Sequence, residues 1–173
     1  MRSARGFSLV EVLVVVIAIG ILAGALLDRV LPLIGRAQRT AFTQVRVDLQ
    51  TALRLTAAER ITRGESATLP ALADVNPMTL LLNPPGNYVG SLAQPDEADV
   101  PAASWYFDER TRHLVYRVGR YTRFDARGGP PGRIELKTEF VYADRDGNGT
   151  FDARSDEFEG LRLTPLHEFA WPD

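Results

Sequence analysis

The longest unbroken apolar pattern lies near the start of the chain. From Phe7 to Leu27 the sequence reads FSLVEVLVVVIAIGILAGALL, 21 residues in which Ser8 and Glu11 are the only notably polar positions. Wound as an α-helix, this segment would be about 32 Å long, close to the roughly 30 Å hydrocarbon core of a bilayer. The pattern therefore predicts a membrane-spanning helix.

A second, amphipathic pattern follows without a clear break. Apolar positions recur every three or four residues, as on one face of a helix, while arginines and an aspartate fall elsewhere. We therefore predict one helix from Phe7 to about Thr62, with Gly20, Gly24 and Pro32 as positions where it could kink or melt. The apolar stripe consists of Ile34, Ala37, Ala41, Val45, Leu49, Ala52, Leu53 and Thr56.

Gly64 marks the predicted end of the helix, and residues 64–104 are rich in Pro, Gly, Asn and Asp. Within them, residues 76–82 (Asn-Pro-Met-Thr-Leu-Leu-Leu) predict a short helical turn, and residues 83–86 (Asn-Pro-Pro-Gly) would end it. This region could be a connecting loop that makes lateral contacts between subunits. Alternatively, its leucines simply cover one edge of the sheet.

Four segments in the last third of the chain have strand character. Residues 134–142 alternate most clearly, with Ile134, Leu136 and Phe140 on one face and charged residues on the other. Because turn-forming residues separate consecutive segments, we predict a four-stranded antiparallel sheet packed on the amphipathic half of the helix. The fold class is therefore α+β. The four segments are residues 105–107, 113–118, 134–142 and 158–166.

The amino-acid composition limits the kinds of functional site that the chain can contain. The net charge of −2 does not indicate a partner. Arginine supplies all of the basic residues except Lys137. Cysteine is absent, which excludes disulfides, thiolate nucleophiles and thiolate metal sites.

The N-terminal segment allows three interpretations. Ser8 to Glu11 can be a capping box that opens a plain signal-anchor helix. Alternatively, Arg2 and Arg5 can precede the apolar core of a secretory signal peptide cleaved after Ala25. Neither accounts for Glu11 together with the Gly-Phe pair before it, and a carboxylate in an apolar membrane segment costs a few kcal/mol.

The third interpretation rests on a resemblance. The segment Gly6-Phe7-Ser8-Leu9-Val10-Glu11, followed by a long apolar run, resembles the prepilin peptidase recognition motif of type IV pilins and type II secretion pseudopilins. The resemblance implies cleavage between Gly6 and Phe7, methylation of the new Phe7 amine, and pairing of Glu11 with the N-terminus of a neighbouring subunit. Residues 76–118 also look like stretches of minor pilin-like proteins. We adopt this interpretation, with the N-terminus on the cytoplasmic side.

The charges that flank the span do not by themselves supply this orientation. Arg29, Arg36, Arg39 and Arg46 follow the span, whereas only Arg2 and Arg5 precede it. The positive-inside rule would place the richer side in the cytoplasm, although it is calibrated on short loops.

Few residues suggest catalysis. His113 and His167 are the only histidines, and neither belongs to a recognisable catalytic motif, so we predict no enzymatic activity. Seven arginines between positions 110 and 133 could grip a nucleic-acid backbone. We instead predict a solvated surface and no nucleic-acid partner. These arginines are Arg110, Arg112, Arg117, Arg120, Arg123, Arg127 and Arg133.

Residues 144–152 (Asp-Arg-Asp-Gly-Asn-Gly-Thr-Phe-Asp) are the strongest candidate for a metal site. Oxygen ligands alternate as in an EF-hand loop, Gly149 stands sixth and Phe151 eighth, but the twelfth position holds Ser155. Asp156 or Glu157 would have to replace the usual glutamate. A simple hairpin turn is the other interpretation, since Asp-Gly and Asn-Gly favour tight turns. The candidate Ca²⁺ ligands are Asp144, Asp146, Asn148, Thr150, Asp152 and Asp156.

The sequence thus predicts a pseudopilin or minor pilin subunit of a type II secretion or type IV pilus filament. Its partners would be other pilin subunits, a prepilin peptidase and an inner-membrane assembly platform. It would be single-pass in the inner membrane with a periplasmic domain, need no cofactor and have one possible structural Ca²⁺. The alternative is a membrane-anchored or secreted calcium-dependent binding module. The predicted parts are a leader (1–6), a membrane helix (7–28), its amphipathic continuation (29–63), a connecting region (64–104) and a β-domain (105–173).

Overall fold

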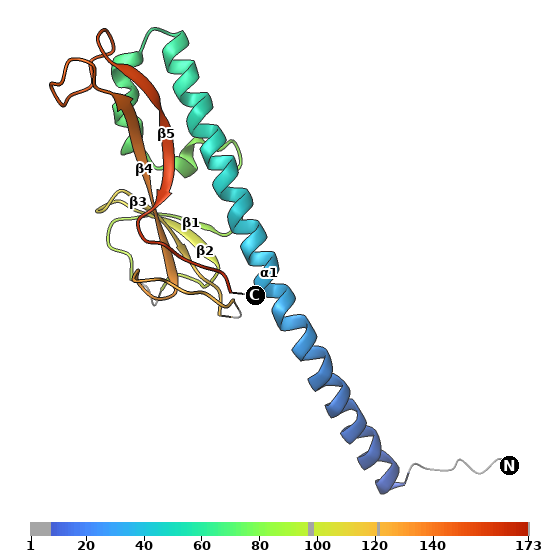
Figure 1. Cartoon of the computed structure of the whole chain (residues 1–173). Helices are drawn as coiled ribbons and strands as arrows, with labels where there is room; N and C mark the ends of the chain where they lie inside the picture. The colour runs from blue at the N-terminus through green and yellow to red at the C-terminus, as the bar shows by residue number, and fades with distance from the viewer. Residues whose placement is uncertain (1–7, 97–98, 121, 173) are drawn as a thin grey trace.

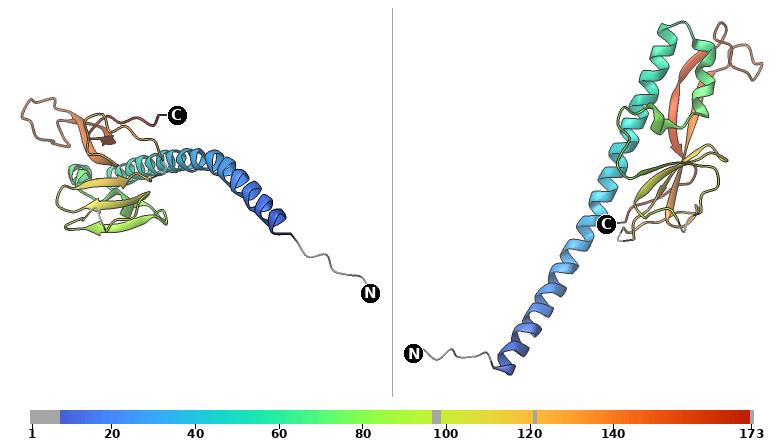
Figure 2. Two further views of the ribbon diagram at one scale, coloured as in Figure 1. Left: turned by 90° about the horizontal axis from the view of Figure 1, so that it is seen from below. Right: turned by 180° about the vertical axis from the view of Figure 1, so that it is seen from behind.

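A computed structural model describes residues 8–96, 99–120 and 122–172, apart from the side chain of Asp28. One long helix, α1 (Leu9–Thr62), projects from a domain that packs along its second half (Figure 1). The predicted single helix is confirmed over the described residues. It continues through Gly20 and Gly24, and it includes Pro32, which lacks a backbone N–H and therefore weakens the helix locally. Figure 2 shows that α1 is curved.

Both ends of α1 are capped by the residues that the sequence places there. The Ser8 hydroxyl accepts a hydrogen bond from the Glu11 backbone N–H at 3.2 Å. At the other end Gly64 has a φ of 76°, a left-handed conformation that glycine adopts most readily. Its N–H donates to the Ile61 carbonyl, and the Glu65 N–H donates to the Arg60 carbonyl. This Schellman arrangement ends the helix.

The sheet has five strands in the order β1-β2-β3-β4-β5. The α+β class is confirmed, but the prediction of four antiparallel strands is wrong in one respect, because β1 is an additional strand that pairs parallel with β2. Its sequence, Tyr-Val-Gly-Ser-Leu, is short and interrupted by Gly90, which hides the alternation expected of a strand. The strands are β1 (Tyr88–Leu92), β2 (Ser104–Asp108), β3 (His113–Arg117), β4 (Arg133–Ala143) and β5 (Glu157–Pro165).

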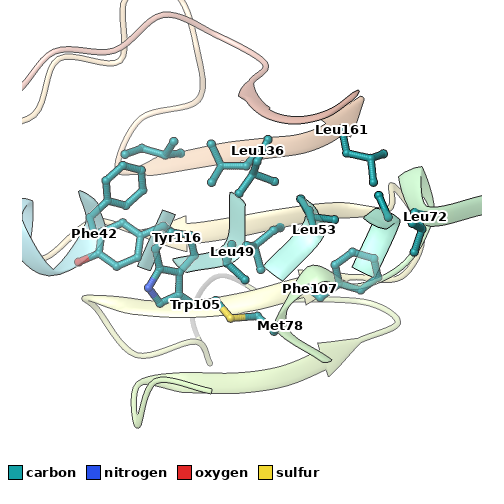
Figure 3. Packing of buried hydrophobic residues seen from close by; sticks show 14 of the residues in the cluster. Phe42, Leu49, Leu53, Leu72, Met78, Trp105, Phe107, Tyr116, Leu136 and Leu161 are labelled. Atoms are coloured by element: carbon teal, nitrogen blue, oxygen red, sulfur yellow. The ribbon is translucent and has the colours of Figure 1, made fainter. Parts of the chain in front are cut away.

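The main core lies between α1 and the facing side of the sheet (Figure 3). From α1 it takes Phe42, Leu49, Leu53 and Ala57, all buried. The predicted stripe is therefore partly wrong, because its first members, Ile34, Ala37 and Ala41, are exposed. The buried line along α1 instead begins at Phe42, seven residues before Leu49.

Two short 3₁₀ helices, η1 (Ser66–Ala73) and η2 (Pro77–Leu80), close one end of this core. The turn predicted at residues 76–82 corresponds to η2, where Met78 donates its backbone N–H to the Asn76 side chain at 3.0 Å. Leu80 and Leu81 pack against the core, whereas Leu82 is 97% exposed. These contacts favour the interpretation that the leucines mostly cover the sheet.

The opposite side of the sheet has a smaller apolar cluster. Val100, from the connection between β1 and β2, is buried against Tyr106 and Val115. This crossing covers β2 from the second side, so all five of its residues are buried. The domain therefore encloses its central strands on both faces.

Candidate assembly helix and acidic loop

The first half of α1 is apolar all round and has no covering partner within the described chain. Its side chains are largely exposed, for example Leu9 at 84% and Leu22 at 69%. The helix contains a stretch that is long and apolar enough to cross a membrane, and none of that stretch is buried. Because a contiguous exposed apolar surface of this size is unstable in water, the segment requires a bilayer or other helices around it.

Glu11 lies in the first turn of this apolar segment and is exposed. The described residues provide no ion-pair partner for its carboxylate. Gly6 and Phe7, the predicted cleavage residues, lie outside the described residues. The structure therefore places Glu11 at the tip of the projecting helix, one turn after the Ser8 cap.

Residues 1–27 match the prokaryotic N-terminal methylation motif. The chain carries the leader signature of type IV pilins and pseudopilins. The resemblance stated from Gly6 to Glu11 is thereby confirmed, and the pilin-type segment coincides with the uncovered part of α1. Neither the comparison with curated proteins nor that with solved structures gives a match.

The acidic loop, residues 144–156, connects β4 to β5 and brings three carboxylates together. One oxygen from each of Asp144, Asp146 and Asp156 lies within 4.8 Å of the others. Glu157, the other candidate for the last ligand, instead forms an ion pair with Arg145. The structure therefore selects Asp156 rather than Glu157 as the residue that faces the other two acids.

Backbone N–H groups already orient the Asp144 carboxylate. Gly149 and Gly147 donate to its two oxygens at 2.8 Å and 2.7 Å. These hydrogen bonds, the one from Gly149 first, lower the pKa of Asp144 below its usual value. The loop is thus folded around an ionised carboxylate.

The remaining predicted ligands lie in the same loop but turn towards its own backbone. The Asn148 side-chain oxygen accepts from the Thr150 N–H at 2.7 Å and from its hydroxyl at 2.6 Å. An Asp152 oxygen accepts from the Arg154 N–H at 2.9 Å. Asn148, Thr150 and Asp152 would therefore have to reorient, or to offer backbone oxygens, in order to join a shared cation.

Phe151 anchors the loop to the sheet. Its ring meets Phe140 and Tyr142 edge-on, with centroids 4.9 Å and 5.4 Å away. The eighth position of the predicted loop thus packs an apolar side chain inwards, which fixes the loop on β4.

Two of the seven arginines between positions 110 and 133 lie close to carboxylates. Arg133 pairs with Glu135 at 2.8 Å, and Arg127 lies 3.9 Å from both Asp125 and Glu168. His113 is half-buried on β3 and His167 is exposed. The absence of a nucleic-acid partner remains a prediction.

The structure contains a cavity that the sequence did not predict. It lies between α1 and the C-terminal segment, has a volume of about 510 Å³, and gathers Arg36 and Arg39 with Arg120 and Arg123. The surplus of arginines after the apolar segment is the one signal in the sequence that points to it. What the sequence could not show is that the chain returns to α1 at this position.

Proposed function

We propose that the chain is a pseudopilin or minor pilin, a structural subunit of a type II secretion or type IV pilus filament. The match of residues 1–27 to the methylation motif supports this structural role, which is not an enzymatic one. One observation supports the proposal above all: the methylation motif runs directly into a helix whose apolar half projects uncovered from a folded domain.

In the proposed pathway, a prepilin peptidase cleaves between Gly6 and Phe7 on the cytoplasmic side and the Phe7 amine is methylated. The apolar half of α1 holds the subunit in the inner membrane with the domain in the periplasm. An assembly platform and its ATPase then move the subunit into a filament. There the uncovered helices pack against one another, and Glu11 neutralises the Phe7 amine of a neighbour.

Cleavage of the leader by a prepilin peptidase provides the direct test of the proposed function. Co-expression with a prepilin peptidase should shorten the wild-type chain, whereas Gly6→Leu should leave it full-length because the peptidase no longer recognises its cleavage site. Ser3→Leu, a change in the same leader that leaves Gly6 and Phe7 intact, is the matched control and should be processed. Peptidase-independent shortening would support the secreted alternative.

We further propose that the acidic loop binds a structural Ca²⁺. Support comes from the three converging carboxylates and from Phe151, which fixes the loop on the sheet. Asp144, Asp146 and Asp156 would supply charged oxygens, and Asn148, Asp152 and the Thr150 carbonyl would complete an oxygen shell. In a chain without cysteine, such an ion would stabilise the β4–β5 connection as a disulfide does in other domains.

A further inference from the structure

The cavity beside α1 is built from three separate parts of the chain. Arg36 and Arg39 come from the helix, Arg120 and Arg123 from the connection between β3 and β4, and Trp171 from the C-terminal segment. Among the described residues that line it, none is acidic. The net charge of the chain is −2, so this concentration of cations does not reflect general basicity.

Specific contacts hold the walls of the cavity in place. The Thr122 hydroxyl donates to the Gln38 side chain on α1. Gly119 lies so close to Gln38 that a Cβ at this position would approach the Gln38 amide oxygen to 2.2 Å. Backbone hydrogen bonds of 3.0 Å and 2.9 Å join Asp125 to Ala170. The arginine-bearing connection is therefore fastened both to the helix and to the C-terminal segment.

Trp171 is fixed in the same way. Its ring lies 5.8 Å from that of Phe42 and 5.4 Å from that of Phe124, measured between centroids. The indole thus belongs to the aromatic core on one side and lines the cavity on the other. With Leu31 and Pro32 it gives the cationic cavity an apolar wall.

The cavity lies at the end of the domain from which the apolar half of α1 projects. Figures 1 and 2 show the C-terminal segment returning to α1 at this end. With a rise of 1.5 Å per residue, Arg36 is about 13 Å along the helix from Leu27. Headgroups occupy roughly 5–8 Å outside the hydrocarbon core, and an arginine side chain can reach back towards them.

We propose that this cavity binds the phosphate of an anionic phospholipid headgroup in the leaflet on the domain side. This inference rests on the membrane anchoring proposed above. One guanidinium group can bind two phosphate oxygens at once through parallel hydrogen bonds, and Arg36 and Arg120 line the same cavity from separate elements. Tryptophan and short apolar side chains suit the boundary between headgroup and acyl chain. A phosphate site would also explain why arginines are numerous on the side of the span where the positive-inside rule predicts few of them.

The test uses the full chain in nanodiscs of phosphatidylcholine with a minority of phosphatidylglycerol. Spin-labelled forms of both lipids report, by electron paramagnetic resonance, which one the protein retains. Wild-type protein should prefer phosphatidylglycerol. Arg36→Gln with Arg120→Gln should reduce that preference about tenfold to thirtyfold, since each surface cation contributes about a factor of five.

Arg29→Gln is the decisive control, because Arg29 is nearer to the span than Arg36 but does not line the cavity. If the cavity binds the headgroup phosphate, Arg29→Gln should reduce the preference for phosphatidylglycerol less than either Arg36→Gln or Arg120→Gln alone. Diffuse attraction to the membrane predicts the reverse order, and that result would overturn the proposal.

Two further outcomes would also contradict it. Loss of the preference on adding millimolar inorganic phosphate would assign the cavity to a free anion. An unchanged lipid preference in the double variant, with loss of filament incorporation, would assign it to a contact between subunits. The intact mass of the same preparations reports processing at Phe7 separately, so failure of the lipid site is distinguishable from failure of the proposed function.

Discussion

The ring of Phe42 on α1 stacks on the indole of Trp105 on β2, with centroids 5.2 Å apart and planes within 4° of parallel. Both side chains are almost fully buried. The pair joins α1 to β2, and Phe42 is the first fully buried residue along the described part of α1. The pair therefore contributes to the attachment of the helix to the domain.

Phe42→Ala should destabilise the domain by about 3–5 kcal/mol, because it removes a large buried ring and leaves a cavity against Trp105. Urea unfolding of a fragment lacking residues 1–28 would measure this, with the combined fluorescence of Trp105 and Trp171 as the reporter. Val47→Ala, on the exposed side of the same helix, is the control and should change stability by less than about 0.5 kcal/mol. Equal effects of the two variants would contradict the packing described.

Gln50 forms a second connection between α1 and the sheet. Its side-chain amide donates to the Leu161 carbonyl at 2.6 Å and accepts from the Leu163 N–H at 3.0 Å. Gln50→Ala should cost about 1–3 kcal/mol, since it leaves two backbone groups of β5 without partners. Gln44→Ala loses only an exposed hydrogen bond to Asp48 and should be nearly neutral. Hydrogen exchange should show faster exchange at Leu163 in the first variant alone.

Glu11→Ala should leave cleavage and membrane insertion intact but block incorporation into filaments. The reason is that the carboxylate would no longer neutralise the Phe7 amine of a neighbouring subunit. Immunoblots of sheared filaments and of membranes would separate these steps. Ser8→Ala, which removes only the helix cap, is a matched control in the same turn and should be incorporated. Normal incorporation of Glu11→Ala would refute the assigned role.

Millimolar Ca²⁺ should raise the melting temperature of the fragment lacking residues 1–28. A ligand that binds only the folded state at a hundredfold excess over its Kd adds about 2.7 kcal/mol, or roughly 6–12 °C here. Mg²⁺ should do much less, because it demands a tighter octahedral shell. Asp144→Ala with Asp146→Ala should abolish the difference, whereas Asp74→Ala, outside the loop, should preserve it.

The calcium effect should also depend on pH in one direction. Because the pKa of Asp144 is lowered in the folded loop, its ionised form stabilises the loop above the unfolded pKa. That contribution is lost as the pH falls through the folded pKa. The Ca²⁺-dependent increase should therefore disappear on acidification and not on moderate alkalinisation. Identical melting in EDTA and in Ca²⁺ at neutral pH would show that the loop is only a turn.

Much of the fold could be predicted because its signals are local. The continuous helix follows from apolar periodicity and from the glycine at position 64, and strand β4 follows from its clear alternation. Strand β1 could not be predicted, since its pairing with β2 depends on a crossing that no local pattern encodes. The helix face was misplaced for a similar reason: only the sheet decides that Phe42, not Ala41, is buried.

The candidate sites also differ in how far they could be predicted from the sequence alone. The leader motif and the spacing of oxygen ligands from Asp144 to Asp152 are contiguous in sequence, so both could be proposed without a structure. The choice of Asp156 over Glu157 required the geometry of the loop, in which Arg145 pairs with Glu157. The arginine cavity required three distant segments to meet at α1, which sequence spacing does not reveal.

The N-terminus of the mature protein tests the central claim most directly. Protein purified from native membranes should begin at Phe7 with a methylated amine, as read by intact mass and N-terminal sequencing. A chain that begins at Leu26 would instead be the product of a conventional signal peptidase. It would lack Glu11 and the apolar half of α1, and that result would contradict the assignment to a pilin-type filament.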